Sequence, residues 1–173
     1  MLGDFIDGDN VGVVQAGGCL RLAPETSEQR AETHSITVKA AGFGGQGILL
    51  LGQIIAEMGM RERMEVSWLP SYGPEMRSGS AHCHVCLSRE RIGSPLVEHP
   101  DVLIAMNEIS LRKFAAFVKR DGIILYNRDE LPEGFTAEAR AVCVPASDLA
   151  DQLGAAKVGN VAMLGALLEL TGV

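Results

Sequence analysis

The stretch AAGFGGQGILLLG, residues 40–52, decides the fold expected for this chain. It places Gly42, Gly44 and Gly47 in a G-x-G-x-x-G spacing, with Gly45 and Gln46 inside the same loop. The short β-branched run SITVKAA precedes it, and the mostly apolar run ILLLGQIIAEMGM follows it. Because glycine permits tight turns and close backbone approach, the pattern predicts a strand, a tight turn and a largely buried helix.

Strand and helix patterns continue to alternate after this unit. Strands are expected over VSWL (66–69), AHCHVCL (81–87), DVLIAM (101–106), IILYN (123–127) and RAVCVPA (140–146), and helices over EISLRKFAAFV (108–118), SDLADQLG (147–154) and NVAMLGALLELTGV (160–173). Ser147 and Asn160 are the expected N-caps of the last two helices. The alternation indicates an α/β fold that is Rossmann-like and three-layered, with a mostly parallel sheet and helices on both faces. No helix precedes AHCHVCL, so a mixed sheet with one antiparallel member is also expected.

Composition narrows the function classes. The 173 residues suit one domain, and a net charge of -7 argues against nucleic acid as a partner. The acidic N-terminus does not have the pattern of a signal peptide, and no apolar run suits a membrane span. We therefore expect a cytoplasmic protein whose four cysteines are thiols. Residues 1–34 differ from the rest and are interpreted as an extension of unknown role, which leaves 35–173 as the folded domain.

The glycine loop has two interpretations. Its spacing, between a strand and a helix, is typical of a dinucleotide cradle, which would suit a stand-alone NAD-dependent Rossmann dehydrogenase. That cradle needs an acidic residue at the end of the second strand to hold the ribose, and this chain has WLPSYG there. Gln46 is also an unusual residue for a pyrophosphate loop. The second interpretation is a turn that shapes the fold at a subunit junction.

Three further segments hold candidate site residues. The loop PSYGPEMRSGSA (70–81) follows a strand end and suits a partner or ligand surface. Asn107 follows the fourth strand, where it could face a ligand or cap the next helix. In HCHVC, the side chains of His82, His84 and Cys86 would share one strand face, which suggests a metal-binding module. A structural zinc site needs four convergent ligands, however, and a half-buried strand accounts for the same pattern, so no metal is assigned.

Four segments in one order resemble a known family. They are GFGGQGILLLGQIIAEMGM, WLPSYGPEMRSGSAHC, IGSPLVEHPDVLIAMN and NVAMLGAL. Together, from about residue 36 onward, they resemble the γ subunit of 2-oxoacid:ferredoxin oxidoreductases. The PSYGPEMR form is similar to the 2-oxoglutarate and branched-chain 2-oxoacid branch. Family members continue beyond the last helix of this chain, so a missing tail is also expected.

The resemblance implies a subunit that is not catalytic alone. The complex would convert a 2-oxoacid, expected to be 2-oxoglutarate with a branched-chain 2-oxoacid as the alternative, to an acyl-CoA while reducing ferredoxin. Thiamine diphosphate, Mg²⁺ and an iron–sulfur cluster would be held by α and β subunits and a ferredoxin-like δ subunit, and coenzyme A would be consumed. This chain has no C-x-x-C-x-x-C run for a cluster. The candidate residues for an active-site wall or an interface are Gly42, Gly44, Gly45, Gln46, Gly47, Ser71, Tyr72, Gly73, Pro74, Glu75, Arg77 and Asn107.

Overall fold

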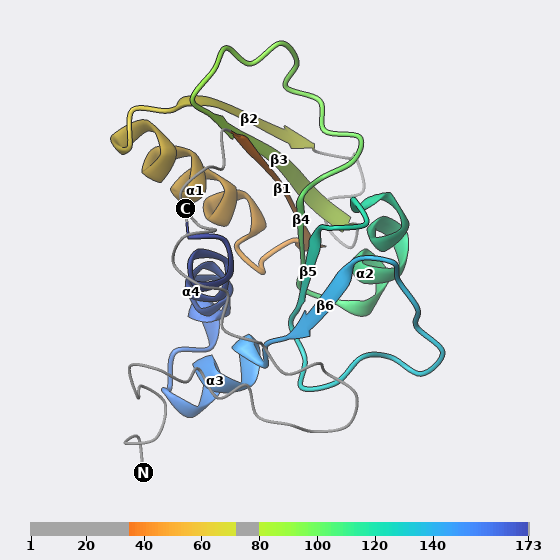
Figure 1. Ribbon diagram of the computed structural model, residues 1–173. Helices are drawn as coiled ribbons and strands as arrows, with labels where there is room; N and C mark the ends of the chain where they lie inside the picture. The colour runs from red at the N-terminus through yellow and green to blue at the C-terminus, as the bar shows by residue number, and fades with distance from the viewer. Residues whose placement is uncertain (1–34, 72–79, 173) are drawn as a thin grey trace.

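A six-stranded sheet organises the part of the protein that the structure describes (Figure 1). The computed structural model describes residues 35–71 and 80–172. Across the sheet the strands run in the order β2-β3-β1-β4-β5-β6. Their bounds are β1 (Ser35–Phe43), β2 (Glu65–Ser71), β3 (Ser80–Ser88), β4 (Val102–Ala105), β5 (Ile123–Tyr126) and β6 (Arg140–Cys143).

The sheet is mixed, as the sequence predicts. β4 pairs in parallel with β1 and β5, and β5 pairs in parallel with β6. β3 is antiparallel to both of its neighbours, β1 and β2. Only the residues from 72 to 79 separate β2 from β3, fewer than a crossover connection between parallel strands needs, so β3 has to return in the opposite direction.

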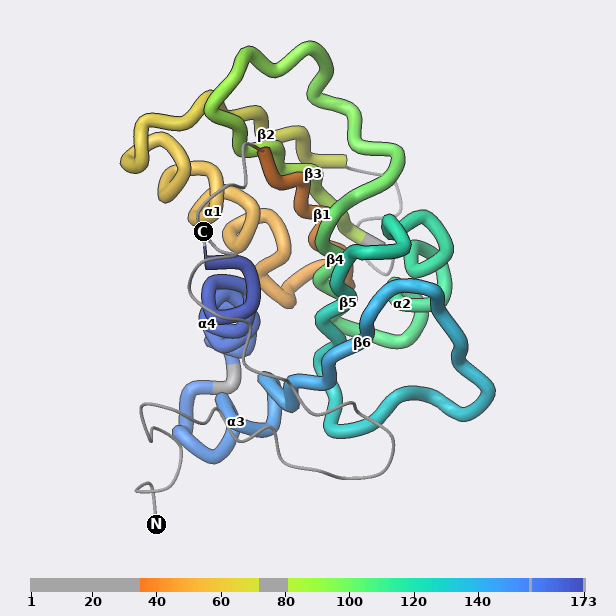
Figure 2. The backbone as a smooth tube through the Cα atoms, in the orientation of Figure 1, coloured from red at the N-terminus to blue at the C-terminus, as the bar shows by residue number. Residues whose placement is uncertain are grey.

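Helices cover both faces of the sheet, which confirms the three-layer fold. α1 (Ile48–Arg61) and α4 (Gly159–Thr171) lie beside each other on one face, and α2 (Glu108–Phe114) lies on the other, followed by a 3-10 turn, η2 (Ala115–Phe117) (Figures 1 and 2). α3 (Ala146–Gln152) follows β6, and a second 3-10 turn, η3 (Ala156–Val158), leads into α4. Among the helices of residues 35–71 and 80–172, none is long and apolar enough to cross a membrane.

Two glycines in α1 let that helix pack closely on β2 and β3. A Cβ added at Gly52 would lie 2.5 Å from the Cys83 Sγ atom and 2.8 Å from the Trp68 Nε1 atom. A Cβ added at Gly59 would lie 2.5 Å from Leu87 Cδ2. The helix can therefore rest directly on strand side chains because it has no side chain of its own at these two points.

The structure corrects two expected helix caps. α3 begins at Ala146 after Pro145, so Ser147 lies inside the helix and does not cap it. α4 begins at Gly159 after Val158, so Asn160 lies in its first turn, and no side chain caps this helix. Both polar side chains bond elsewhere in the fold, as described below. The helix expected over 108–118 is also shorter, since its last turn has 3-10 geometry.

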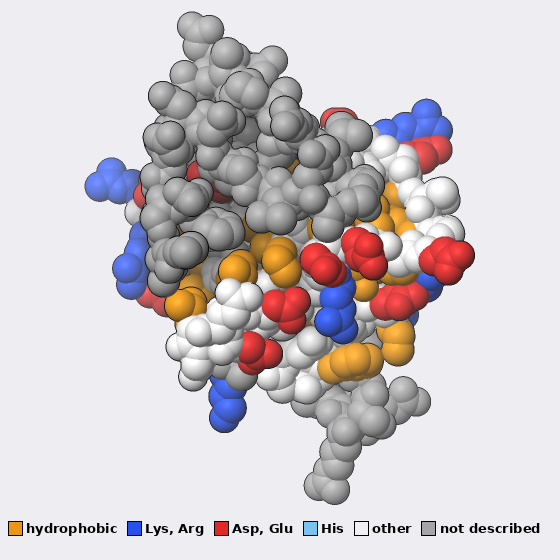
Figure 3. Space-filling model, turned by 90° about the horizontal axis from the view of Figure 1, so that it is seen from below, with side chains coloured by type: hydrophobic (Ala, Val, Ile, Leu, Met, Phe, Trp, Pro, Cys, Tyr) orange, Lys and Arg blue, Asp and Glu red, His pale blue; other side chains and the backbone are white. Residues whose placement is uncertain are grey.

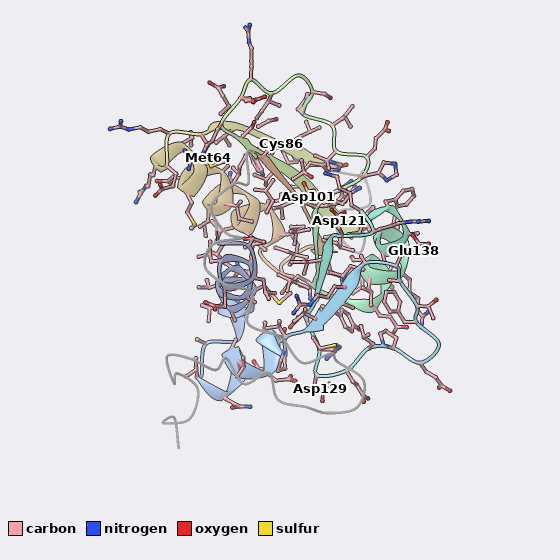
Figure 4. The ribbon with its side chains drawn as sticks, in the orientation of Figure 1. Met64, Cys86, Asp101, Asp121, Asp129 and Glu138 are labelled. Carbon is pink, nitrogen blue, oxygen red and sulfur yellow. The ribbon has the colours of Figure 1, made fainter. Side chains whose placement is uncertain are left out.

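A carboxylate fixes the amino end of β4 to β1. Asp101, labelled in Figure 4, precedes β4, and its Oδ2 atom accepts hydrogen bonds from Thr37 N at 2.8 Å and Thr37 Oγ1 at 2.5 Å. The Lys119 Nζ atom lies 2.5 Å from the other carboxylate oxygen. These bonds fix the register of the two parallel strands at the end opposite the glycine loop.

Candidate functional site

The candidate site lies at the carboxyl ends of the parallel strands, the lower edge in Figure 1, where β6 leads into α3. The glycine loop leaves β1 there, and Asn107 follows β4 at the same edge. β2 also ends there, because Ser71 pairs with His82 and Phe43 pairs with Ser80. Open α/β sheets use this edge for their functional loops.

The described part of the site does not include the whole predicted set. Ser71 is the half-buried last residue of β2. Tyr72, Gly73, Pro74, Glu75 and Arg77 lie outside the described residues, so their part in the site stays a prediction. The structure places the glycine loop and Asn107 together.

Three positions of the loop favour glycine, two because of the backbone angle and one because of space. Gly45 and Gly47 have φ angles of 93° and 71°, in the left-handed region that favours glycine. At Gly42 the requirement is space, since an added Cβ would lie 2.9 Å from Met106 Cβ. Gly44 is exposed in the turn between them. The strand, turn and helix expected from the spacing are therefore confirmed.

Gln46 closes the glycine loop from within. Its Oε1 atom accepts hydrogen bonds from Phe43 N at 2.7 Å and from Asn107 Nδ2 at 3.2 Å. Its Nε2 atom donates to the Met106 carbonyl oxygen at 3.3 Å. The Phe43 amide is thus directed at Gln46 and cannot also serve a pyrophosphate in this conformation. An unusual residue for a dinucleotide cradle is here the side chain that ties the loop to β4.

Asn107 caps α2, which confirms one of its two interpretations. Its Oδ1 atom accepts from Ser110 N at 2.8 Å, and its backbone is extended, as an N-cap requires. Its Nδ2 atom donates a hydrogen bond to Gln46 Oε1, so both ends of the buried amide have partners within the chain. The side chain therefore positions α2 against the glycine loop.

Two more asparagines bond to the same loop and strand ends, and neither was predicted as a site residue from the sequence. Asn127 directly follows β5, is buried, and donates to the Met106 carbonyl at 3.3 Å and to Ser147 Oγ at 2.8 Å. Its Oδ1 atom accepts from Ser147 N at 2.9 Å. Asn160, from α4, donates to the Gly47 carbonyl at 3.3 Å. Asn127 could have been found by its position, since Asn107 also follows a buried strand.

The HCHVC strand divides its side chains between the two faces, as the alternation predicts. Cys83 packs in the core beneath α1, where burial raises the pKa of its thiol to about 11. His82, His84 and Cys86 face the other side. Across residues 35–71 and 80–172, no three His, Cys, Asp or Glu side chains converge as metal ligands would. The described cysteines therefore do not form the convergent thiolate set that a cluster or a zinc ion needs.

Residues 37–173 match the family model described as pyruvate ferredoxin/flavodoxin oxidoreductase. This chain belongs to that family. The match covers the glycine loop, the amide network and all but the first two residues of the described sheet. The resemblance found in the sequence is therefore confirmed at the level of the family, and the comparisons give no support to a stand-alone NAD-dependent dehydrogenase.

Named relatives agree with the family match. The ketoisovalerate oxidoreductase subunit VorA of Methanothermobacter thermautotrophicus is 46% identical over 140 residues, which cover 80% of this chain and 29% of VorA. The chain thus spans less than a third of that relative. The γ subunit of a keto/oxoacid ferredoxin oxidoreductase from Geobacter sulfurreducens has a TM-score of 0.67 and 27% identity, and the match covers 79% of this chain and 78% of that one.

A larger enzyme contains a similar unit. The 2-oxoglutarate:ferredoxin oxidoreductase of Magnetococcus marinus, solved with 2-oxoglutarate, coenzyme A and succinyl-CoA bound, matches with a TM-score of 0.72 and 27% identity. The match covers 80% of this chain and 25% of that chain. The same fold therefore occurs both as a separate γ subunit and as a minor part of longer chains.

Proposed function

We propose that this chain is the γ component of a 2-oxoacid:ferredoxin oxidoreductase. The family match supports the class of complex, and similarity to a separate γ subunit over most of both chains supports the role within it. The complex would cleave a 2-oxoacid, transfer the acyl group to coenzyme A and pass the electrons to ferredoxin. This chain would contribute a surface to that complex and no reacting group.

The closed amide network is the observation that carries this proposal. Asn107 donates to Gln46, and the side chains of Gln46 and Asn127 both donate to the Met106 carbonyl. Groups held this way position backbone, and none of them is left as a general base, a nucleophile or a metal ligand. The described residues also lack a convergent ligand set. Thiamine diphosphate, Mg²⁺ and iron–sulfur clusters are accordingly assigned to the α, β and δ components, where δ is a ferredoxin-like chain.

An apolar rim around the glycine loop supports a docking role. Phe43, Leu50 and Val161 expose 37%, 53% and 51% of their surfaces. They come from the ends of β1, α1 and α4 that meet at the bond from Asn160 to Gly47. Figure 3, which views the molecule from below, shows apolar side chains among acidic ones on the part of this face that grey atoms leave visible. A partner subunit would cover the rim. The exposed side of α4 would then pack against the partner, while its buried side packs in the core.

A branched-chain 2-oxoacid is the favoured substrate class. Identity is 46% to the ketoisovalerate oxidoreductase subunit and 32% to the 2-oxoglutarate synthase subunit KorC of the same organism. 2-Oxoglutarate, the acid expected from the family resemblance, is the second candidate, since the PSYGPEMR loop is similar to both branches. The components that hold thiamine would make most contacts with either acid. The preference for a branched-chain substrate therefore rests on sequence similarity and not on the geometry of this chain.

Purification of the complex from native cells tests the proposal. An affinity tag on the full chain should bring down the thiamine-binding components. The purified assembly should reduce ferredoxin with coenzyme A and 3-methyl-2-oxobutanoate, faster than with 2-oxoglutarate or pyruvate. The tagged chain alone should give no reduction. Failure to recover any thiamine-dependent partner under gentle conditions would refute the proposal, whereas a faster rate with 2-oxoglutarate would change only the substrate.

A further inference from the structure

A group of basic side chains lies on the face of β1 and β3 that is turned away from α1. Lys39 of β1 is opposite His84 of β3, and Ala41 is opposite His82. Lys39 and His84 are buried, with 8% and 7% of their surfaces exposed, and His82 is half-buried. The function proposed above does not use any of these side chains.

The basic side chains surround the phenyl ring of Phe114, from α2. The Lys39 Nζ atom lies 4.4 Å from the ring centroid, and the Nζ atom of exposed Lys113 lies 5.2 Å from it. The His82 ring centroid is 5.1 Å from that of Phe114 and 5.7 Å from that of His84. Buried Lys39 therefore forms the floor of the group, and Lys113 and His82 form its opening.

The group has no acidic counterpart in residues 35–71 and 80–172. No ion pair joins a carboxylate there to Lys39 or Lys113, and the buried Nδ1 atom of His82 has no hydrogen-bond partner. The His84 Nδ1 atom accepts from Val97 N at 3.2 Å. Burial, and then the charge of Asp101, raise the pKa of Cys86 on this side of the sheet, and Asp101 itself is bonded to Thr37 and Lys119.

Burial and mutual repulsion both favour the uncharged forms of these basic side chains. Desolvation, with Lys113 nearby, lowers the pKa of the Lys39 ammonium. Desolvation and the charge of Lys39 lower the pKa of both histidines, that of His84 to about 4. A buried ammonium without a counter-ion is costly, and stacking on one aromatic ring offsets only a part of that cost.

We infer that Lys39, Lys113 and His82 form a binding site for an oxyanion, a carboxylate or phosphate group that supplies the missing negative charge. The anion would accept hydrogen bonds from both ammonium groups and from the free ring nitrogen of His82. The same two lysines repel a metal cation, which separates this site from the metal-binding module suggested by HCHVC. The inference does not depend on the function proposed above.

Histidine titration in the full chain tests the site. The ring proton signals of His82, His84 and His99 would be followed by NMR against pH, in sodium sulfate, in sodium formate, and in sodium chloride of equal ionic strength. Sulfate represents a phosphate group because it keeps its charge over the whole range. We expect either anion to raise the pKa of His82 saturably, by at least about half a unit. His99, which is exposed and hydrogen-bonded to the Phe117 carbonyl, is the control, and its ring signals should be the same in all three salts.

Matched lysine variants decide the outcome. Lys113 is exposed, so Lys113→Gln should not disturb folding. It is expected to weaken the apparent affinity of the anion, read from the shift in the pKa of His82, about threefold or more. Lys119→Gln, which removes an equal charge beside Asp101, should leave the response unchanged. Lys39→Met should abolish it in a chain whose amide spectrum stays native. An equal shift at His99, no response to either anion, or no difference between the Lys113 and Lys119 variants would overturn the inference.

Discussion

The two faces of β1 and β3 are made from alternate residues of the same strands, yet they differ in kind. On the α1 side, Val38, Ala40, Cys83, Val85 and Leu87 are almost fully buried in one apolar cluster. On the other side, Thr37, Lys39, His82, His84 and Cys86 hold polar and titratable groups. The first face is completed by the chain's own helices. The second is covered by α2 only in part, so it retains chemistry that an external group can complete.

The largest expected effect comes from truncating the apolar face. Leu87→Ala should lower the free energy of unfolding by about 3 kcal/mol, because it leaves a cavity against Gly59 of α1. Urea denaturation of the full chain measures this. Cys86→Ala, one residue earlier and on the other face, should cost about 1 kcal/mol. Equal costs would mean that the two faces contribute alike to stability and would break the comparison.

The junction of α1 and α4 on the apolar face gives the next largest effect. Gly47→Ala should cost about 2–3 kcal/mol, because φ is 71° and the new Cβ would lie 2.5 Å from Asn160 Nδ2. Gly45→Ala is the matched control, with φ of 93° and no atom within 4 Å of the added Cβ, and should cost about 1–2 kcal/mol. Thermal unfolding of both variants separates the contact from the backbone strain. If the two were equally stable, the Asn160 contact would contribute nothing.

The polar face should control the dependence of stability on pH. His84 has a folded pKa of about 4, below its unfolded value, so the unfolded chain binds its proton first. Stability from this residue is complete above about pH 6.5, has fallen by about 2 kcal/mol at about pH 5, and is lost as pH falls through 4. Urea midpoints between pH 7 and 4, compared with His84→Gln, measure the loss. An unchanged slope in the variant would show that other groups cause it.

The attachment of α2 to the polar side gives the smallest effect. Gln46→Met should cost about 1–2 kcal/mol, since Phe43 N and Asn107 Nδ2 lose their acceptor. Gln46→Glu keeps an acceptor for both and, at acidic pH where its carboxyl is protonated, also a donor for the Met106 carbonyl, so at that pH it should cost less. Hydrogen exchange at the amide of Ser110, which Asn107 caps, reports on the same junction. Faster exchange in the Glu variant than in the Met variant would contradict this network.

The fold could be predicted from the sequence to a large extent because its signals are local. The spacing of Gly42, Gly44 and Gly47 between an apolar strand and an apolar helix specified the β1–α1 turn. The absence of a helix pattern in the sequence before β3 predicted the antiparallel strand. The predicted N-caps of α3 and α4 were wrong for a physical reason. Ser147 is hydrogen-bonded to Asn127, and Asn160 is hydrogen-bonded to Gly47. Both partners are distant in the sequence, so local propensity could not predict them.

The sequence by itself determined the α/β class, the glycine turn, the alternation of two chemical faces on β3 and the resemblance to a family. Tertiary structure decided what Gln46 does, because its partners Asn107 and Met106 lie about 60 residues away along the chain. It also decided that Lys39, Lys113 and His82 meet around Phe114. Periodicity records which face a side chain occupies, whereas the neighbours on that face depend on how distant strands and helices pack.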